Sequence, residues 1–159
     1  MAKTNFIIEP GQQVLTMTRT FNAPRALVFK AYTDPSIVPQ WYGKRDQTTT
    51  VDRMEVKKGG IWRYVIHDAH GSEYAFNGVY HTITAPELLV NTFEFEGLPD
   101  HIGLITTTFT EQNGQTLMSE FSLYPSVEDR DGVVAAGMEG GAVESMDRFE
   151  ECLVKALAK

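Results

Sequence analysis

Two different periods of apolar and polar residues divide this chain of 159 residues. Between residues 12 and 21 the side chains alternate with a period of two, and the many β-branched residues there favour a strand. Pro24 then stands where a helix begins, and the pair Asp34 and Pro35 ends that helix. Residues 35–42 predict a second, short helical turn. The chain therefore begins with one strand followed by two short helices.

The middle of the chain consists of strand-like segments separated by turn residues. Asn113 and Gly114 form a strong signal for a tight hairpin, and residues 68–71 and 85–87 mark two further turns. Successive hairpins predict an antiparallel meander rather than parallel crossover units. The predicted strands of this region are Thr48–Glu55, Gly60–His67, Glu73–Thr84, Glu87–Phe95, Ile102–Glu111 and Thr116–Tyr124.

After Ser126 the apolar period changes to three and four residues, which predicts a long amphipathic helix at the C-terminus. Gly137, Gly140 and Gly141 interrupt it, each at a cost of about 1 kcal/mol relative to alanine. They indicate a kink, a close approach of the helix to the sheet, or room for a ligand; close packing is the favoured interpretation. The apolar stripe consists of Val134, Met138, Ala142, Met146, Phe149, Leu153 and Leu157.

Composition and charge narrow the classes of function. The net charge of −7 argues against a nucleic-acid partner, because phosphate binding requires a basic face. No apolar stretch is long enough to cross a bilayer, and the N-terminus lacks the apolar core of an export signal. The single cysteine, Cys152, fits a reducing compartment. We therefore expect a cytoplasmic protein without membrane insertion. The chain length fits one domain, which we place at residues 12–159 after an N-terminal extension at residues 1–11.

Several short motifs follow one another in a specific order from about residue 14 to the C-terminus. They are residues 19–25 (RTFNAPR), the helix end at 29–35, 41–43 (WYG), 59–64 (GGIWRY), 78–80 (GVY), 130–132 (RDG), 137–138 (GM) and 144–149 (ESMDRF). In this combination the chain resembles the START-like (SRPBCC) superfamily, in the Aha-type branch named after the activator of the heat-shock chaperone ATPase.

The resemblance implies an α+β helix-grip fold. In that fold a curved antiparallel sheet of about six or seven strands wraps around a long C-terminal helix, and two short helices follow the first strand. Members of the superfamily bind lipids, polyketides or other apolar molecules, some are cyclases or hydrolases, and some act through protein contacts. The fold does not choose among these functions. The favoured hypothesis is binding of a small hydrophobic or amphipathic ligand between sheet and helix. The alternatives are a chaperone partner, linked to a stress response, and a cyclase or hydrolase acting on an aromatic substrate.

Strand parity identifies candidate residues for such a cavity. Aromatic residues recur at every second position in three of the predicted strands, and we place these sets on the concave side, facing the C-terminal helix. Filling of the core and lining of a ligand site explain these positions equally well. The candidate ligand-binding residues are Trp41, Trp62, Tyr64, Phe76, Tyr80, Phe93, Phe95, Met138, Met146 and Phe149.

The polar residues predict no catalytic group, no metal site and no cofactor. His67 and His70 lie across a turn, and a zinc site needs more preorganised ligands than they offer. Glu120 alternates with apolar neighbours in its strand, which predicts that it points outward into solvent. For Arg148, a surface ion pair with Glu144, four residues earlier on the helix, is the favoured interpretation.

Overall fold

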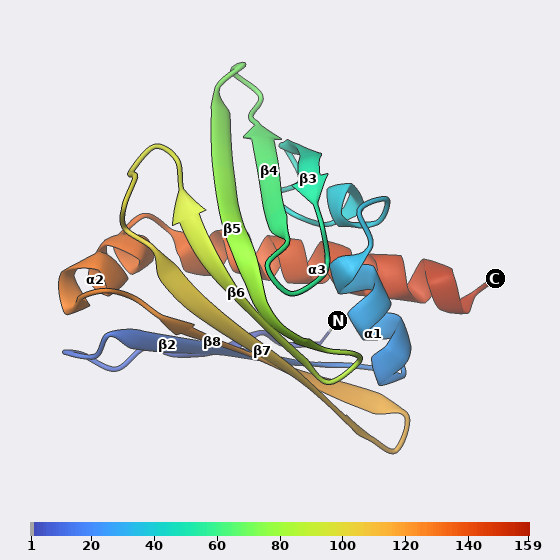
Figure 1. The fold of residues 1–159 in the computed structure, drawn as a ribbon. Coiled ribbons are helices and arrows are strands. Elements are labelled where there is room, and N and C mark those ends of the chain that lie inside the picture. Colours follow the sequence, from blue (N-terminus) through green and yellow to red (C-terminus); the bar gives the residue numbers. More distant parts are fainter. Residues whose placement is uncertain (1) are drawn as a thin grey trace.

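The computed structural model describes residues 2–159, which form one eight-stranded antiparallel sheet with a helix running across it (Figure 1). The strands are β1 (Asn5–Ile7), β2 (Val14–Phe21), β3 (Thr48–Met54), β4 (Ile61–His67), β5 (Glu73–Thr84), β6 (Leu88–Phe95), β7 (Gly103–Gln112) and β8 (Gln115–Leu123). Their order in the sheet is β1-β2-β8-β7-β6-β5-β4-β3. The helices are α1 (Arg25–Thr33), the short 3-10 helix η1 (Val38–Gln40), α2 (Val127–Ala135) and α3 (Met138–Leu157). Within residues 2–159, none of the helices is both long enough and apolar enough to span a membrane.

This arrangement confirms the predicted α+β helix-grip fold. The six strands predicted in the middle of the chain are all present, each to within one residue at either end. The sheet has eight strands rather than six or seven because β1 pairs with β2 at its edge. With only three residues, β1 is too short to show an alternating pattern, and it lies in the stretch predicted as an N-terminal extension. Met1 lies outside the described residues.

The curved sheet contains two irregularities and one unusually close contact. The pairing register shifts at residues 51–53 in β3 and at residues 80–82 in β5, and bulges of this kind bend a strand and increase its twist. Gly78 of β5 lies beneath the Trp62 indole, so that a Cβ there would collide with the Trp62 ring and with the Thr92 carbonyl. The absence of a side chain lets Trp62 Nε1 donate across β5 to Thr92 O at 3.2 Å.

The C-terminal helical region is divided, although the sequence pattern predicted one long helix. Helix α2 ends at Ala135 and α3 begins at Met138, with Gly137 between them at a φ of 90°. That conformation is left-handed, and glycine adopts it without steric cost. The Ser126 hydroxyl accepts a hydrogen bond from the Asp129 N–H and thus caps the first turn of α2. A kink is one of the three interpretations of these glycines, and at Gly137 the helix is interrupted completely.

The C-terminal half of α3 packs against the sheet through an aromatic core. Phe149 is fully buried, and its ring centroid lies 4.9 Å from that of Trp41 and 5.1 Å from that of Phe21. The rings of Phe29 in α1 and Phe109 in β7 meet at 5.4 Å. All three pairs are edge-to-face, the arrangement that aromatic quadrupoles favour. These contacts join α1, η1 and α3 to the concave side of the sheet.

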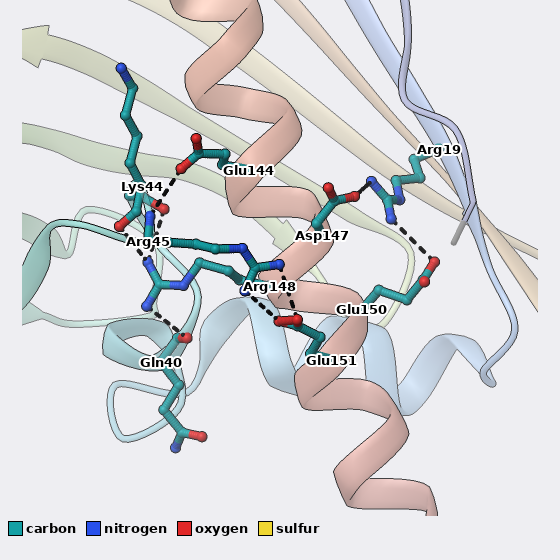
Figure 2. Close-up of polar contacts among 10 residues, drawn as sticks. Arg19, Gln40, Lys44, Arg45, Glu144, Asp147, Arg148, Glu150 and Glu151 are labelled. Atoms are coloured by element: carbon teal, nitrogen blue, oxygen red, sulfur yellow. Dashed lines mark hydrogen bonds and ion pairs between the residues drawn. The ribbon is translucent and has the colours of Figure 1, made fainter.

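A buried arginine joins the same half of α3 to β2 (Figure 2). Arg19 is 1% exposed and donates to Asp147 Oδ1 at 2.8 Å and to Glu150 Oε1 at 3.2 Å. The Thr4 hydroxyl accepts a further bond at 2.9 Å. Two carboxylates on neighbouring turns of one helix offset the desolvation of the guanidinium. The pairing therefore fixes both the position and the rotation of α3 on the sheet.

A second arginine connects α3 to the loop that follows η1 (Figure 2). Arg148 donates to the backbone carbonyls of Gln40 at 3.0 Å, Gly43 at 2.9 Å and Lys44 at 3.1 Å. The predicted surface pair of Arg148 with Glu144 is therefore wrong. Carbonyl groups at the end of a short helix lack intrahelical partners, and a guanidinium with five donors satisfies several of them at once.

The contrast between a buried and an exposed arginine that pair with α3 gives a testable prediction. Arg19→Ala should lower the free energy of unfolding by about 3 kcal/mol, because it leaves Asp147 and Glu150 without their cation. Arg45→Ala removes the exposed pair with Glu151 and should cost much less, because solvent screens that pair. Urea denaturation of both variants measures the difference, and equal losses would contradict the anchoring role of Arg19.

Candidate functional site

A cavity of about 710 Å³ lies between the sheet and the N-terminal half of α3. Strands β4 to β8 provide most of one wall, and α3 together with the loop after η1 provides the other. The lining is mainly apolar and aromatic, with a few polar groups. This size and composition are typical of sites that bind small molecules.

Aromatic rings from neighbouring strands form the sheet side of the cavity. Tyr64 pairs with Phe76, and Phe76 pairs with Phe95, so that rings of β4, β5 and β6 stand side by side. The ring centroid of Phe76 lies 5.3 Å from that of Phe93 and 5.2 Å from that of Phe95. Nine of the ten predicted ligand-binding residues line the cavity, and their role in binding stays a prediction: Trp41, Trp62, Tyr64, Phe76, Tyr80, Phe93, Phe95, Met138 and Met146.

The tenth candidate, Phe149, does not belong to the lining. It follows Met146 by one turn of α3 and is fully buried against Trp41 and Phe21. The apolar stripe of the helix is continuous in sequence, but its two halves meet different surroundings. Met138, Ala142 and Met146 border the cavity, whereas Phe149 and Leu153 are buried in the core.

Gly137, just before α3, and Gly141, within it, lie at the open side of the cavity. Gly137 and Lys44 are exposed lining residues and mark its mouth. A Cβ at Gly141 would meet only Lys44 Cε, at 3.9 Å, and a Cβ at Gly140 would meet nothing within 4 Å. The favoured prediction, close packing of these glycines on the sheet, is therefore wrong. They leave space, and Gly141 lines the cavity whereas Gly140 does not.

The loop after η1 forms the opposite rim of the mouth and is bonded to α3. The Ser145 hydroxyl accepts a hydrogen bond from the Gly43 N–H at 3.0 Å, next to the carbonyls that Arg148 binds. The indole N–H of Trp41 donates to Ala31 O at 3.1 Å, which fixes the orientation of this lining residue. Both sides of the mouth are thus held by specific hydrogen bonds.

Glu120 lines the cavity, although the sequence pattern predicted an outward side chain. It does share a strand face with Met118 and Ser122, but that face is the inner one. Met118 and Ser122 are at most 2% exposed, whereas Phe121 on the other face is 42% exposed. Because the outer face of β8 carries apolar residues, alternation along this strand predicts the wrong face as the buried one. The signal that could have placed Glu120 correctly is its pairing with Met17 on the inner face of β2.

Three phenols surround the Glu120 carboxyl. The Tyr32 hydroxyl donates to Glu120 Oε2 at 3.0 Å. Burial raises the pKa of Glu120 above its usual value, and the bond from Tyr32 opposes the rise. The pKa of Tyr32 is raised as well, mainly by burial and to a lesser extent by the negative charge of Glu120. The same two causes raise the pKa of Tyr42. They also raise the pKa of Tyr124, to about 12. The site thus combines a carboxyl that takes up a proton readily with phenols that do not release theirs.

Metal-binding geometry is absent from the part of the chain that the structure describes. No group of three or more His, Cys, Asp or Glu residues in it could hold a metal ion. His67, at the end of β4, lies 3.4 Å from Glu73 across the turn into β5.

A curved sheet that grips a helix and encloses a cavity defines a START-like protein. The sequence model of the family described as "Activator of Hsp90 ATPase homolog 1-like protein" matches residues 22–154. The chain belongs to this family. No curated protein matches the chain.

Solved structures share the fold at low sequence identity. Protein Ms6760 from Mycobacterium smegmatis is 23% identical, with a TM-score of 0.86 over 96% of this chain and 97% of its own. A protein from Staphylococcus epidermidis is 27% identical, with a TM-score of 0.79 over 94% of each chain. DynU16, from the dynemicin biosynthetic locus, is 19% identical, with a TM-score of 0.71 over 91% of this chain and 48% of its own.

The raised pKa of Glu120 predicts how stability depends on pH. The favourable effect of the neutral carboxyl is fully present below the unfolded pKa, near 4.5, and is lost as the pH rises through the higher folded pKa. The amide introduced by Glu120→Gln does not titrate in this range. The free energy of unfolding of Glu120→Gln, relative to the natural protein, should therefore increase with pH and then level off. Urea denaturation from about pH 4 to about pH 8 measures this, and a pH-independent difference would contradict the raised pKa.

Proposed function

We propose that the protein binds a small hydrophobic or amphipathic molecule, such as a lipid or a polyketide-like aromatic compound, in the cavity between sheet and α3. The observation that carries this proposal is the cavity of about 710 Å³ with its aromatic walls. A ligand that buries about 200 Å² of apolar surface there would gain about 5 kcal/mol, before the costs of association.

Glu120 favours a second candidate function, a cyclase or hydrolase acting on an aromatic substrate. A carboxyl with a raised pKa holds a proton more readily than an ordinary one and can exchange it with a bound molecule. Such groups occur preferentially at catalytic sites. DynU16, which shares the fold, comes from a biosynthetic locus. Loss of turnover in Glu120→Gln, with ligand affinity retained, would distinguish this function from simple binding.

A third candidate is a cytoplasmic partner of a chaperone ATPase in a stress response. Its support is the description of the family alone. Stimulation of an Hsp90-type ATPase by the purified protein would support it, whereas an unchanged ATPase rate in the presence of excess protein would remove it.

An amide NMR titration with pooled lipids, sterols, flavonoids and polyketide-like aromatics tests the proposed binding. We expect shifts at cavity residues such as Trp62, Tyr80 and Met138, because a ligand would change the ring currents around them. Ile7, an exposed residue of β1 outside the lining, should remain unperturbed and serves as an internal control. Perturbation confined to outer-face residues would overturn the proposal, as would a complete lack of shifts.

Two neighbouring glycines provide a matched test of the cavity mouth. Gly141→Phe should weaken binding of an apolar probe roughly tenfold, because the new ring would occupy the lining next to Lys44. Gly140→Phe gains the same helix propensity, but it lies at an exposed position outside the lining and should leave the affinity unchanged. Isothermal titration measures both variants. Equal affinities would show that ligands do not use this cavity.

A further inference from the structure

We propose that Glu120 makes the cavity selective for neutral aromatic molecules that carry a hydroxyl group, and that anions of the same shape are excluded. The inference rests on the proposed binding function and adds the chemical class of the ligand. The hydroxyl donates to Glu120 Oε1, and the aromatic body lies against the rings of β4, β5 and β6.

One oxygen of Glu120 is bonded within the protein, and the other is available to a ligand. Oε2 accepts the hydrogen bond from Tyr32, and among residues 2–159 only Tyr32 donates to this carboxyl. Because the side chain lines the cavity, the remaining acceptor capacity faces the space in which a ligand would lie. A partly buried acceptor without a donor is unfavourable, so a hydroxyl group at this point is favoured.

Two further polar residues of the lining lie beside Glu120 on the sheet. Ser122 and Asn91 lie in the row of the sheet next to Glu120, and both pair with Ile105. Asn91 uses its amide N–H₂ to donate to Thr92 O at 3.0 Å. Away from this row, β4, β5 and β6 line the sheet side mainly with aromatic rings, together with Ile66 and Leu89. A molecule with one polar end and a flat apolar body matches this division.

The charges around Glu120 disfavour an anion. The charged residues of the lining are Lys44, Asp68 and Glu120. Lys44 is exposed at the mouth, and Asp68 uses its Oδ1 to accept N–H groups of its own turn. The residues next to Glu120 on α1, β2, β7 and the flanking loops carry no positive charge: Tyr32, Met17, Thr107, Tyr42 and Tyr124. Arg19 is the next inward-facing residue of β2, and its guanidinium is already paired with Asp147 and Glu150 of α3. Helix α3 contributes no titratable group to the lining. A carboxylate or sulfonate placed here would face a like charge without a counterion.

Three probes that share one ring system separate this inference from the binding function itself. At about pH 8, we expect 2-naphthol to bind roughly tenfold more tightly than naphthalene, and 2-naphthalenesulfonate to bind more weakly than either. Lowering the pH should strengthen binding of the sulfonate, which stays charged while Glu120 takes up a proton. Amide NMR titrations measure all three affinities. If no probe perturbs the cavity residues, the binding function fails; equal affinities would preserve the binding function and overturn the selectivity.

Two substitutions of Glu120 test whether the selectivity arises there. Glu120→Gln keeps the size of the side chain and should shift the ratio of sulfonate to naphthol affinity roughly tenfold towards the sulfonate, without further pH dependence. Glu120→Leu should abolish the advantage of 2-naphthol over naphthalene. Glu9→Gln makes the same change in charge at an exposed position outside the lining and should leave all ratios unchanged. Unchanged preferences in both Glu120 variants would overturn the inference.

Discussion

The uneven attachment of α3 to the sheet is the constraint on which the rest of the structure depends. Its C-terminal half is held by Phe149 in the aromatic core and by the carboxylates that surround Arg19. Its N-terminal half follows a break at Gly137, and the glycines at 140 and 141 leave open space beside the helix. A helix packed along its whole length would fill the concave face. The cavity therefore results from the way in which one helix is anchored at one end.

A carboxyl inside this cavity is costly, and the fold compensates for it only in part. Burial disfavours the charged form of Glu120, and Tyr32 supplies one hydrogen bond in return. Incomplete compensation of this kind is typical of residues that act on a bound molecule. Both recognition of a ligand and transfer of a proton would use the same atom, Oε1 of Glu120. Membership of the family does not choose between these two functions.

The sequence predicts the elements of this fold well and the direction of individual side chains less well. Alternation and turn residues locate the six central strands, because strand parity and hairpin chemistry are local properties. The parity of β4 to β6 also places the aromatic residues correctly on the concave side. The predicted outward direction of Glu120 is wrong because its neighbour Phe121 is an apolar residue on the outer face. Only the pairing of β8 with β2 reveals which face of β8 is the inner one. The predicted ion pair of Arg148 is wrong because its partners are backbone carbonyls, and the pattern of side chains along a sequence contains no information about these.

The bonds from Arg148 and Ser145 to the loop after η1 have a mechanical consequence. Both rims of the mouth belong to one bonded unit, because the loop cannot move away from α3 without losing contacts to Gln40, Gly43 and Lys44. A side-chain flap would admit molecules of many shapes by opening further for large ones. Here the backbone of the loop is held to α3, and Lys44 is an exposed side chain beside it that can move. The spacing between the loop and α3 at this side of the cavity is therefore set by the fold itself and not by the molecule that enters.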